Sequence, residues 1–215
     1  MTDGNGRRCA VIFNPAKVSD GFREAMSARL AAARWMNPIW LPTTEDDPGR
    51  SMAASAVEQQ VDLVVAAGGD GTVRIVADGL ANSGIPMGIV PSGTANLLAR
   101  NLQIPLAEAD AIDVVLSGRT RTIDLIKLSV DGGEGEHFAV MAGMGIDAMI
   151  MDETRAELKD KIGSAAYLVA AAGALGRLPV PMRIKVDDHR PHRRRAMICV
   201  AVSYTHLTLP TILLV

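Results

Sequence analysis

Short apolar runs alternate with amphipathic stretches over the first half of the chain. These runs do not alternate between apolar and polar residues. Such continuous apolar runs are typical of strands that are buried on both faces of a parallel sheet. The runs cover residues 9–13, 38–42, 61–67 and 88–90, and the stretches with apolar residues at helical spacing cover residues 21–34, 51–60, 73–80 and 97–102. The alternation predicts a β-α-β-α-β-α-β-α unit around a parallel sheet.

The pattern changes after a further predicted helix at residues 107–116, which Gly118 stops. Residues 121–130 and 137–142 are predicted to form a hairpin, as are residues 182–186 and 196–202. The basic segment 190–195 is predicted to be a solvated loop; the alternative is a segment that attracts anionic lipid head groups. The apolar stretch 162–178 is too short to span a membrane and is predicted to pack on a second sheet. The predicted fold class is α/β, with a Rossmann-like nucleotide-binding domain (residues 1–118) and a second, mostly β domain (residues 119–215).

A glycine-rich turn, Gly68-Gly69-Asp70-Gly71-Thr72, joins a predicted buried strand to a predicted helix. Glycines at such a turn let phosphate oxygens approach backbone N–H groups at the positive end of a helix. A carboxylate repels phosphates unless a cation lies between them, so Asp70 indicates a Mg²⁺-dependent nucleotide site. Thr72 offers a hydroxyl to a phosphate or to metal-bound water. The alternative is a simple strand-to-helix turn in which Asp70 is a helix cap.

A second turn, residues 91–96 (Pro-Ser-Gly-Thr-Ala-Asn), lies between the next predicted strand and helix. Thr94 and Asn96 can cap the helix or form hydrogen bonds to a ligand. Turns after neighbouring parallel strands face each other at the carboxyl edge of the sheet, where such folds bind ligands. We call residues 68–72 the first glycine turn and residues 91–96 the second glycine turn.

The two glycine turns, with the second continuing as Leu-Leu-Ala-Arg-Asn-Leu to residue 102, resemble the catalytic domain of the diacylglycerol kinase family. This family includes sphingosine kinases and bacterial lipid kinases, which transfer the γ-phosphate of ATP to a lipid hydroxyl. The resemblance implies that ATP binds at Gly68, Gly69, Gly71, Thr72, Gly93, Thr94 and Asn96, with Mg²⁺ at Asp70. It also implies a lipid substrate that is met at the membrane surface.

The same resemblance adds residues outside the glycine turns. Asn14 and Lys17 match the opening motif of the family near the nucleotide, although Asn14-Pro15 also reads as a plain strand-ending turn. Thr44, chosen over Thr43, matches a nucleotide-contacting threonine. Asp124 matches an aspartate tied to the active site, and we assign it with Asp70 as catalytic; the alternative is an ordinary surface residue.

The resemblance covers residues 9–202 and then stops. The family continues with further strands and a glutamate proposed as the general base, whereas residues 203–215 match no family pattern and resemble a foreign tail. We therefore expect a truncated second domain that lacks this base. Leu97 is a further departure, because many members carry an acidic residue there.

Composition narrows the classes of function. Hydrophobic residues make up 48% of the chain, aromatic residues 3%, and the formal net charge is −2. Few aromatic residues and no long run of like charge disfavour a nucleic-acid partner. Cys9 and Cys199 are predicted to be buried free thiols, which suits a reducing cytoplasm. The family resemblance implies a location peripheral to the membrane. The oligomeric state is open, a homodimer included.

Two rival functions remain from the sequence. An NAD kinase carries a similar first glycine turn but phosphorylates a different acceptor, and the second glycine turn favours the lipid kinases. A nucleotide-binding module without turnover is the other alternative, because the chain lacks the C-terminal part of the family. A dehydrogenase is disfavoured since the first strand–helix turn has no GxGxxG fingerprint.

Overall fold

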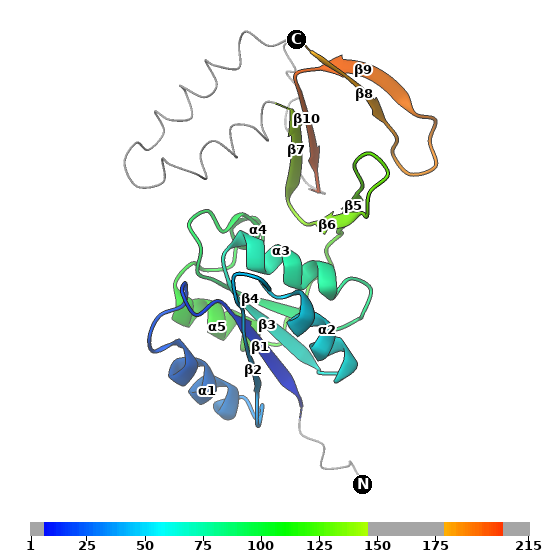
Figure 1. Cartoon of the computed structure of the whole chain (residues 1–215). Helices are drawn as coiled ribbons and strands as arrows, with labels where there is room; N and C mark the ends of the chain where they lie inside the picture. Colours follow the sequence, from blue (N-terminus) through cyan, green and yellow to red (C-terminus); the bar gives the residue numbers. More distant parts are fainter. Residues whose placement is uncertain (1–6, 146–178, 204–215) are drawn as a thin grey trace. The chain divides into compact units, whose positions relative to one another are not determined.

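The structure is a computed structural model that describes residues 7–145 and 179–203 (Figure 1). The described residues form two compact units, one comprising residues 7–140 and the other residues 141–145 and 179–203. The functional domain boundary near Gly118 stays a prediction. The predicted helix at residues 162–178 and residues 204–215 of the tail lie outside the described part of the chain.

The first unit contains a four-stranded parallel sheet in the order β2-β1-β3-β4. Its strands are β1 (Cys9–Phe13), β2 (Ile39–Pro42), β3 (Leu63–Gly68) and β4 (Met87–Pro91). Its helices are α1 (Phe22–Ala32), α2 (Arg50–Glu58), α3 (Asp70–Gly79), α4 (Leu97–Asn101) and α5 (Glu108–Leu116). The predicted alternation of strands and helices is confirmed.

Strand β3 is one of the two central strands of the sheet, and all six of its residues are buried. Its alternate side chains enter two different clusters, as the period of a strand requires. Val64 and Ala66 pack with residues of α2 and α3, such as Ala53 and Val76. On the other face, Val65 and Ala67 pack with α1 and α5; this cluster includes Phe22, Met26, Leu30 and Ile112. Helices on both faces explain why the strands read as continuous apolar runs.

A hairpin follows the sheet within the first unit. Strands β5 (Ile126–Leu128) and β6 (Glu136–Phe138) pair antiparallel, with Ile126 opposite Phe138. The predicted hairpin is confirmed, but its strands are shorter than residues 121–130 and 137–142. Strand β6 packs against α3, and this contact becomes important at the candidate site.

The second unit corrects one predicted pairing. Strand β8 (Val180–Ile184) pairs with β9 (His192–Ala196), whereas β10 (Ile198–Val202) pairs with β7 (Met141–Gly145). The prediction that residues 182–186 pair with 196–202 is therefore wrong, and the basic segment forms a strand instead of a loop. Exposed positions of a hairpin tolerate charged side chains, so the arginines do not prevent strand formation.

Both cysteines are free thiols, Cys9 buried and Cys199 half-buried. Burial raises the pKa of the Cys9 thiol to about 12, which keeps it protonated and unreactive at neutral pH. Over the described residues, we find no helix with the length and apolar character required to cross a membrane.

Candidate functional site

The two glycine turns meet at the carboxyl ends of β3 and β4. The N–H of Ser92 donates to the carbonyl oxygen of Gly68 over 2.9 Å, which joins the turns at the point where both strands end. A Cβ atom on Gly93 would lie only 2.6 Å from the Cα of Gly69. Since real Cβ atoms do not approach backbone atoms so closely, the contact requires glycine at position 93.

Asp70 links the turns through its side chain. It is the first residue of α3, and its carboxylate accepts hydrogen bonds from the backbone N–H groups of Asn96, at 2.8 Å, and Leu97, at 2.6 Å. The helix cap at α3 is Gly69, which has no side chain to bond. The alternative that Asp70 caps its own helix is therefore wrong, because its carboxylate binds the start of α4 instead.

The carboxylate of Asp70 keeps the capacity to bind a cation. An ionised carboxylate has about four lone-pair sites, and the two N–H groups use two of them. Within residues 7–145 and 179–203, no group of three or more His, Cys, Asp or Glu side chains could hold a metal ion. Mg²⁺ is commonly bound by one or two carboxylates together with phosphate oxygens and water. Asp70 thus fits a Mg²⁺ that arrives with a nucleotide.

Asn96 fixes the shape of the second glycine turn. Its backbone is left-handed, with φ of +50°, a conformation that asparagine tolerates better than most residues. Its side-chain Oδ1 accepts from the N–H of Gly93 at 2.8 Å, and its Nδ2 donates to the carbonyl oxygen of Gly93 at 2.7 Å. The amide is thus engaged within the turn, while Thr94 beside it is exposed.

The first glycine turn has one closed side and one open side. The side chain of Thr72 is buried and lies under Gly68, where an added Cβ would come within 2.8 Å of the Thr72 Cβ. Gly71, by contrast, has no neighbouring atom within 4 Å of such a Cβ. Open space beside Gly71 is what a bound phosphate requires, whereas the Thr72 hydroxyl lies on the packed side.

The loops after β1 and β2 carry three other predicted site residues. Asn14 donates its N–H to the carbonyl oxygen of Ala67 at the end of β3, over 2.9 Å, and its Oδ1 accepts from the N–H of Ala16. Lys17 follows in the same turn and is exposed. Thr44 is exposed and Thr43 is buried, so the threonine that we chose is the accessible one. All three follow the carboxyl ends of strands, as a shared ligand site requires.

Asp124 lies in an exposed segment two residues before β5. Its catalytic role, like the roles of the other site residues, stays a prediction.

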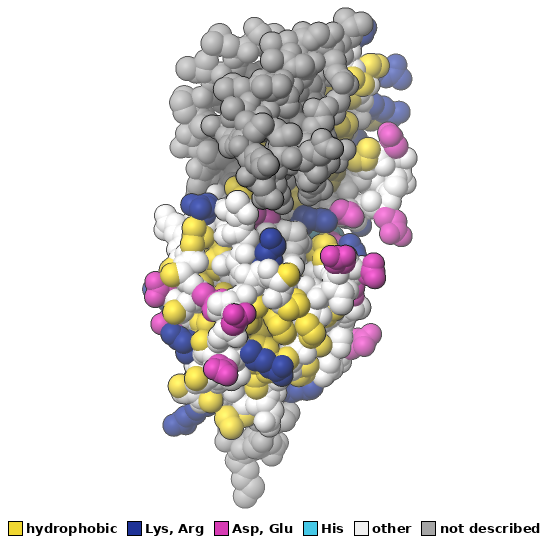
Figure 2. All heavy atoms as spheres, turned by 60° about the vertical axis from the view of Figure 1, so that its left-hand side comes forward, with side chains coloured by type: hydrophobic (Ala, Val, Ile, Leu, Met, Phe, Trp, Pro, Cys, Tyr) yellow, Lys and Arg dark blue, Asp and Glu magenta, His cyan; other side chains and the backbone are white. Residues whose placement is uncertain are grey.

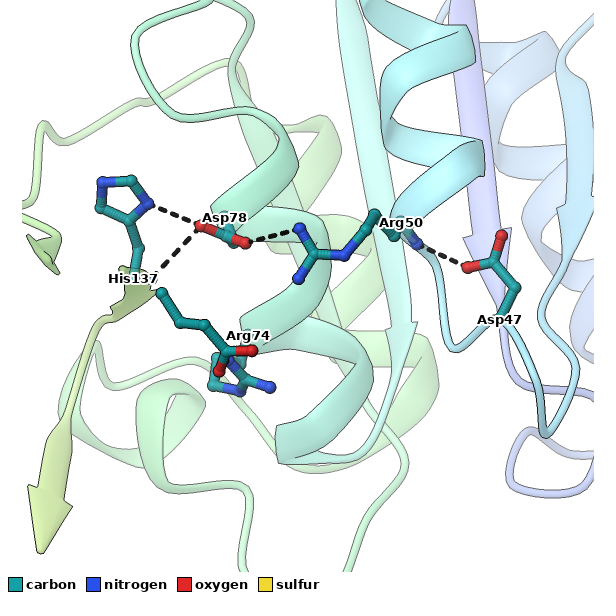
Figure 3. Close-up of polar contacts among 6 residues, drawn as sticks. Asp47, Arg50, Arg74, Asp78 and His137 are labelled. Atoms are coloured by element: carbon teal, nitrogen blue, oxygen red, sulfur yellow. Dashed lines mark hydrogen bonds and ion pairs between the residues drawn. The ribbon is translucent and has the colours of Figure 1, made fainter. Parts of the chain in front are cut away.

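An ion-pair cluster around Asp78, near the other end of α3, was not foreseen from the sequence (Figure 3). Asp78 of α3 has a side chain that is only 10% exposed. Its Oδ1 accepts from the backbone N–H of His137, at 3.3 Å, and lies 2.6 Å from the ring Nδ1, while its Oδ2 lies 3.2 Å from Arg50. Arg74 and Glu136 form a second ion pair alongside, at 3.0 Å. The two pairs fasten β6 to α3.

The acidity of Asp78 follows from these contacts. Burial alone would raise the pKa of its carboxyl group, but the hydrogen bonds from His137 and the charges of Arg50 and His137 outweigh burial and lower it. The lowered pKa means that the ionised carboxylate stabilises the folded state.

We expect Asp78→Asn to lower the free energy of unfolding by about 2 kcal/mol at neutral pH, the scale of lost charged hydrogen bonds. Because the folded pKa lies below the unfolded value of about 3.9, the contribution is present above that pH and disappears as the pH falls through the folded pKa. Urea unfolding of both proteins over a pH series measures this difference.

The matched control is Asp113→Asn, which removes the exposed ion pair with Arg29 and should change stability by less than about 1 kcal/mol. A difference between wild type and Asp78→Asn that stays constant down to acidic pH would contradict the assigned role of the carboxylate.

Comparisons with known proteins show which family this chain resembles. The family model of the diacylglycerol kinase catalytic domain matches residues 8–128. A diacylglycerol kinase of Mycobacterium tuberculosis is 36% identical over 140 residues, which cover 64% of this chain and 45% of that protein. One of Staphylococcus epidermidis is 29% identical over 189 residues, covering 85% and 58%. This chain thus spans about half the length of these curated relatives.

A solved structure supports the fold. The crystal structure of a diacylglycerol kinase from Bacillus anthracis superposes with a TM-score of 0.65 at 24% identity, covering 92% of this chain and 64% of that one. At this identity the likeness concerns the fold alone. The family model, however, covers more than half of the chain and contains both glycine turns, so the protein belongs to the diacylglycerol kinase catalytic-domain family.

Proposed function

We propose that this chain provides the nucleotide site of an ATP-dependent lipid kinase, which transfers the γ-phosphate of ATP to a lipid hydroxyl. The observation that carries the proposal is the junction of the two glycine turns, which Asp70 bridges by accepting the N–H groups of Asn96 and Leu97. A carboxylate beside an open glycine turn and the N-terminus of a helix is suited to a metal-bound nucleotide.

In this proposal the chain positions the phosphates through its backbone. The N–H groups at the start of α3 and the free space beside Gly71 receive phosphate oxygens, since a helix N-terminus favours negative charge. Asp70 holds Mg²⁺, which neutralises the charge of the phosphates when bound. Thr94 and the turn fixed by Asn96 form the opposite wall, and Lys17, Asn14 and Thr44 contribute from the neighbouring loops. Asp124 is proposed as a second catalytic carboxylate.

The acceptor is proposed to be diacylglycerol, a sphingoid base or a related lipid. Family membership supports a lipid acceptor over NAD. Fixed placement of both reactants accounts for most of the catalysis in phosphoryl transfer, because there is little covalent chemistry for the protein to perform.

The test is transfer of label from γ-³²P-ATP to a panel of diacylglycerol, sphingosine, phosphatidylglycerol and NAD, with and without Mg²⁺. We expect Mg²⁺-dependent label in one lipid and none in NAD. Label in NAD would favour the NAD kinase alternative. Calorimetric binding of ATP without transfer to any acceptor would instead favour a nucleotide-binding module.

A further inference from the structure

One face of the β8–β9 hairpin is a cluster of arginines. Residues directly opposite each other in an antiparallel pair project to the same face. Arg183 lies opposite Arg193, and Arg195 lies opposite Pro181, so these three arginines share one face. All three are exposed. We call Arg183, Arg193 and Arg195 the arginine face.

The positive charge of the arginine face is not balanced by carboxylates of the described chain. Like charges directly opposite each other destabilise a strand pair, yet none of the ion pairs between described residues involves the hairpin. The guanidinium of Arg195 donates to the carbonyl oxygen of Pro179, at 3.4 Å. An anion from outside the chain would relieve the repulsion.

The surroundings of the arginine face are open and partly apolar. An open hollow of about 480 Å³ is lined by Pro181, Met182, Arg183, Arg193, Arg194 and Arg195. On the visible face of the first unit, by contrast, basic, acidic and hydrophobic side chains are interspersed (Figure 2).

We propose that the arginine face is a docking surface for a membrane that contains anionic lipids. Guanidinium groups bind phosphates through directed hydrogen bonds, and clusters of basic residues are attracted to the negative surface of anionic lipids. A nucleic acid fits less well, because the hairpin has no Phe, Tyr or Trp on which bases could stack. The inference rests on the proposed function, since a lipid kinase must reach a substrate that resides in a bilayer.

The test is vesicle flotation of the full chain with phosphatidylcholine alone and with phosphatidylcholine mixed with phosphatidylglycerol. Each basic residue at an anionic surface adds about fivefold in affinity, so the double variant Arg193→Gln/Arg195→Gln should bind the mixed vesicles about 30-fold more weakly. The matched control is Arg34→Gln/Arg119→Gln, which removes two exposed charges from the first unit and should bind as the wild type does.

The variants also separate binding from folding. Removing like charges should leave the urea unfolding midpoint of the double variant equal to or above that of wild type. Equal binding of wild type and double variant to mixed vesicles would overturn the inference, as would equal binding of wild type to neutral vesicles. If the chain bound a single-stranded oligonucleotide more tightly than mixed vesicles, the partner of the arginine face would be a nucleic acid and the membrane proposal would be overturned.

A parallel assay with detergent-dispersed lipid keeps the two proposals apart. We expect wild type and double variant to phosphorylate dispersed lipid equally, because the arginine face is not assigned to the nucleotide site. Turnover of dispersed lipid together with arginine-independent vesicle binding would contradict the proposed docking surface but not the proposed kinase function. Arginine-dependent vesicle binding without any turnover would contradict the proposed kinase function and support the docking surface.

Discussion

Gly93→Ala is expected to abolish nucleotide binding and to destabilise the first unit by about 3 kcal/mol, the upper end of the usual cost of overpacking. The added Cβ would lie 2.6 Å from the Cα of Gly69 and 2.9 Å from the Oδ1 of Asn96. The first of these neighbours is a backbone atom, which cannot rotate away. The two glycine turns must therefore separate, and the bonds between Asp70 and the start of α4 must lengthen with them.

Gly71→Ala is the matched control for stability. The same methyl group would meet no atom within 4 Å, and alanine is favoured over glycine inside a helix by about 1 kcal/mol. We expect thermal unfolding of Gly71→Ala at or above the wild-type temperature, and calorimetry of Gly93→Ala with ATP to show no binding. Equal unfolding temperatures for the two variants would show that the turns can move apart without cost.

Asp70→Asn is expected to reduce Mg²⁺-dependent phosphoryl transfer by roughly 10²–10³-fold or more, the scale of losing a preorganised charged group. The change also removes an acceptor, because an amide has one oxygen where the carboxylate has two. In the wild type, the carboxylate of Asp70 accepts hydrogen bonds from two backbone N–H groups, at 2.8 and 2.6 Å. Leaving one donor unsatisfied should cost about 1–3 kcal/mol of stability.

Two measurements separate the catalytic and structural consequences of this change. If Asp70 holds the metal, calorimetry should show a large loss of affinity for ATP in the presence of Mg²⁺ and a small loss in its absence. A purely structural carboxylate would weaken both affinities equally, and that outcome would contradict the proposed metal site. Asp113→Asn serves as the control for removing a negative charge from an exposed helix position.

The strands and helices of the first unit could be predicted because burial on both faces leaves a strong pattern. Strand β3 has no exposed residue, so the sequence shows it as a continuous apolar run. The strands of the second unit are different, since β9 places three consecutive arginines at exposed positions and reads as a loop. Its neighbour β10 pairs with β7, more than fifty residues earlier in the chain, and local patterns do not contain such pairings.

The positions of the glycines in the candidate site could be predicted from the sequence, but most of the hydrogen bonds of the site could not. The two turns could be placed together because parallel strands end at one edge. The partners of Asp70, however, are backbone N–H groups, which any residue type at positions 96 and 97 other than proline would supply. The pair of Asp78 and His137 joins residues 59 positions apart, and neither residue differs by type from an ordinary surface residue.

Helix α3 is held at both of its ends. Its first residue, Asp70, is bonded to the start of α4, and Asp78, one residue before its end, is bonded to β6 and to Arg50 at the start of α2. A helix of ten residues is about 15 Å long and resists bending over that distance. Because it is bonded at each end, the helix cannot shift along its axis without breaking bonds at both ends. The helix therefore links the β5–β6 hairpin to the two glycine turns through the bonds at its two ends.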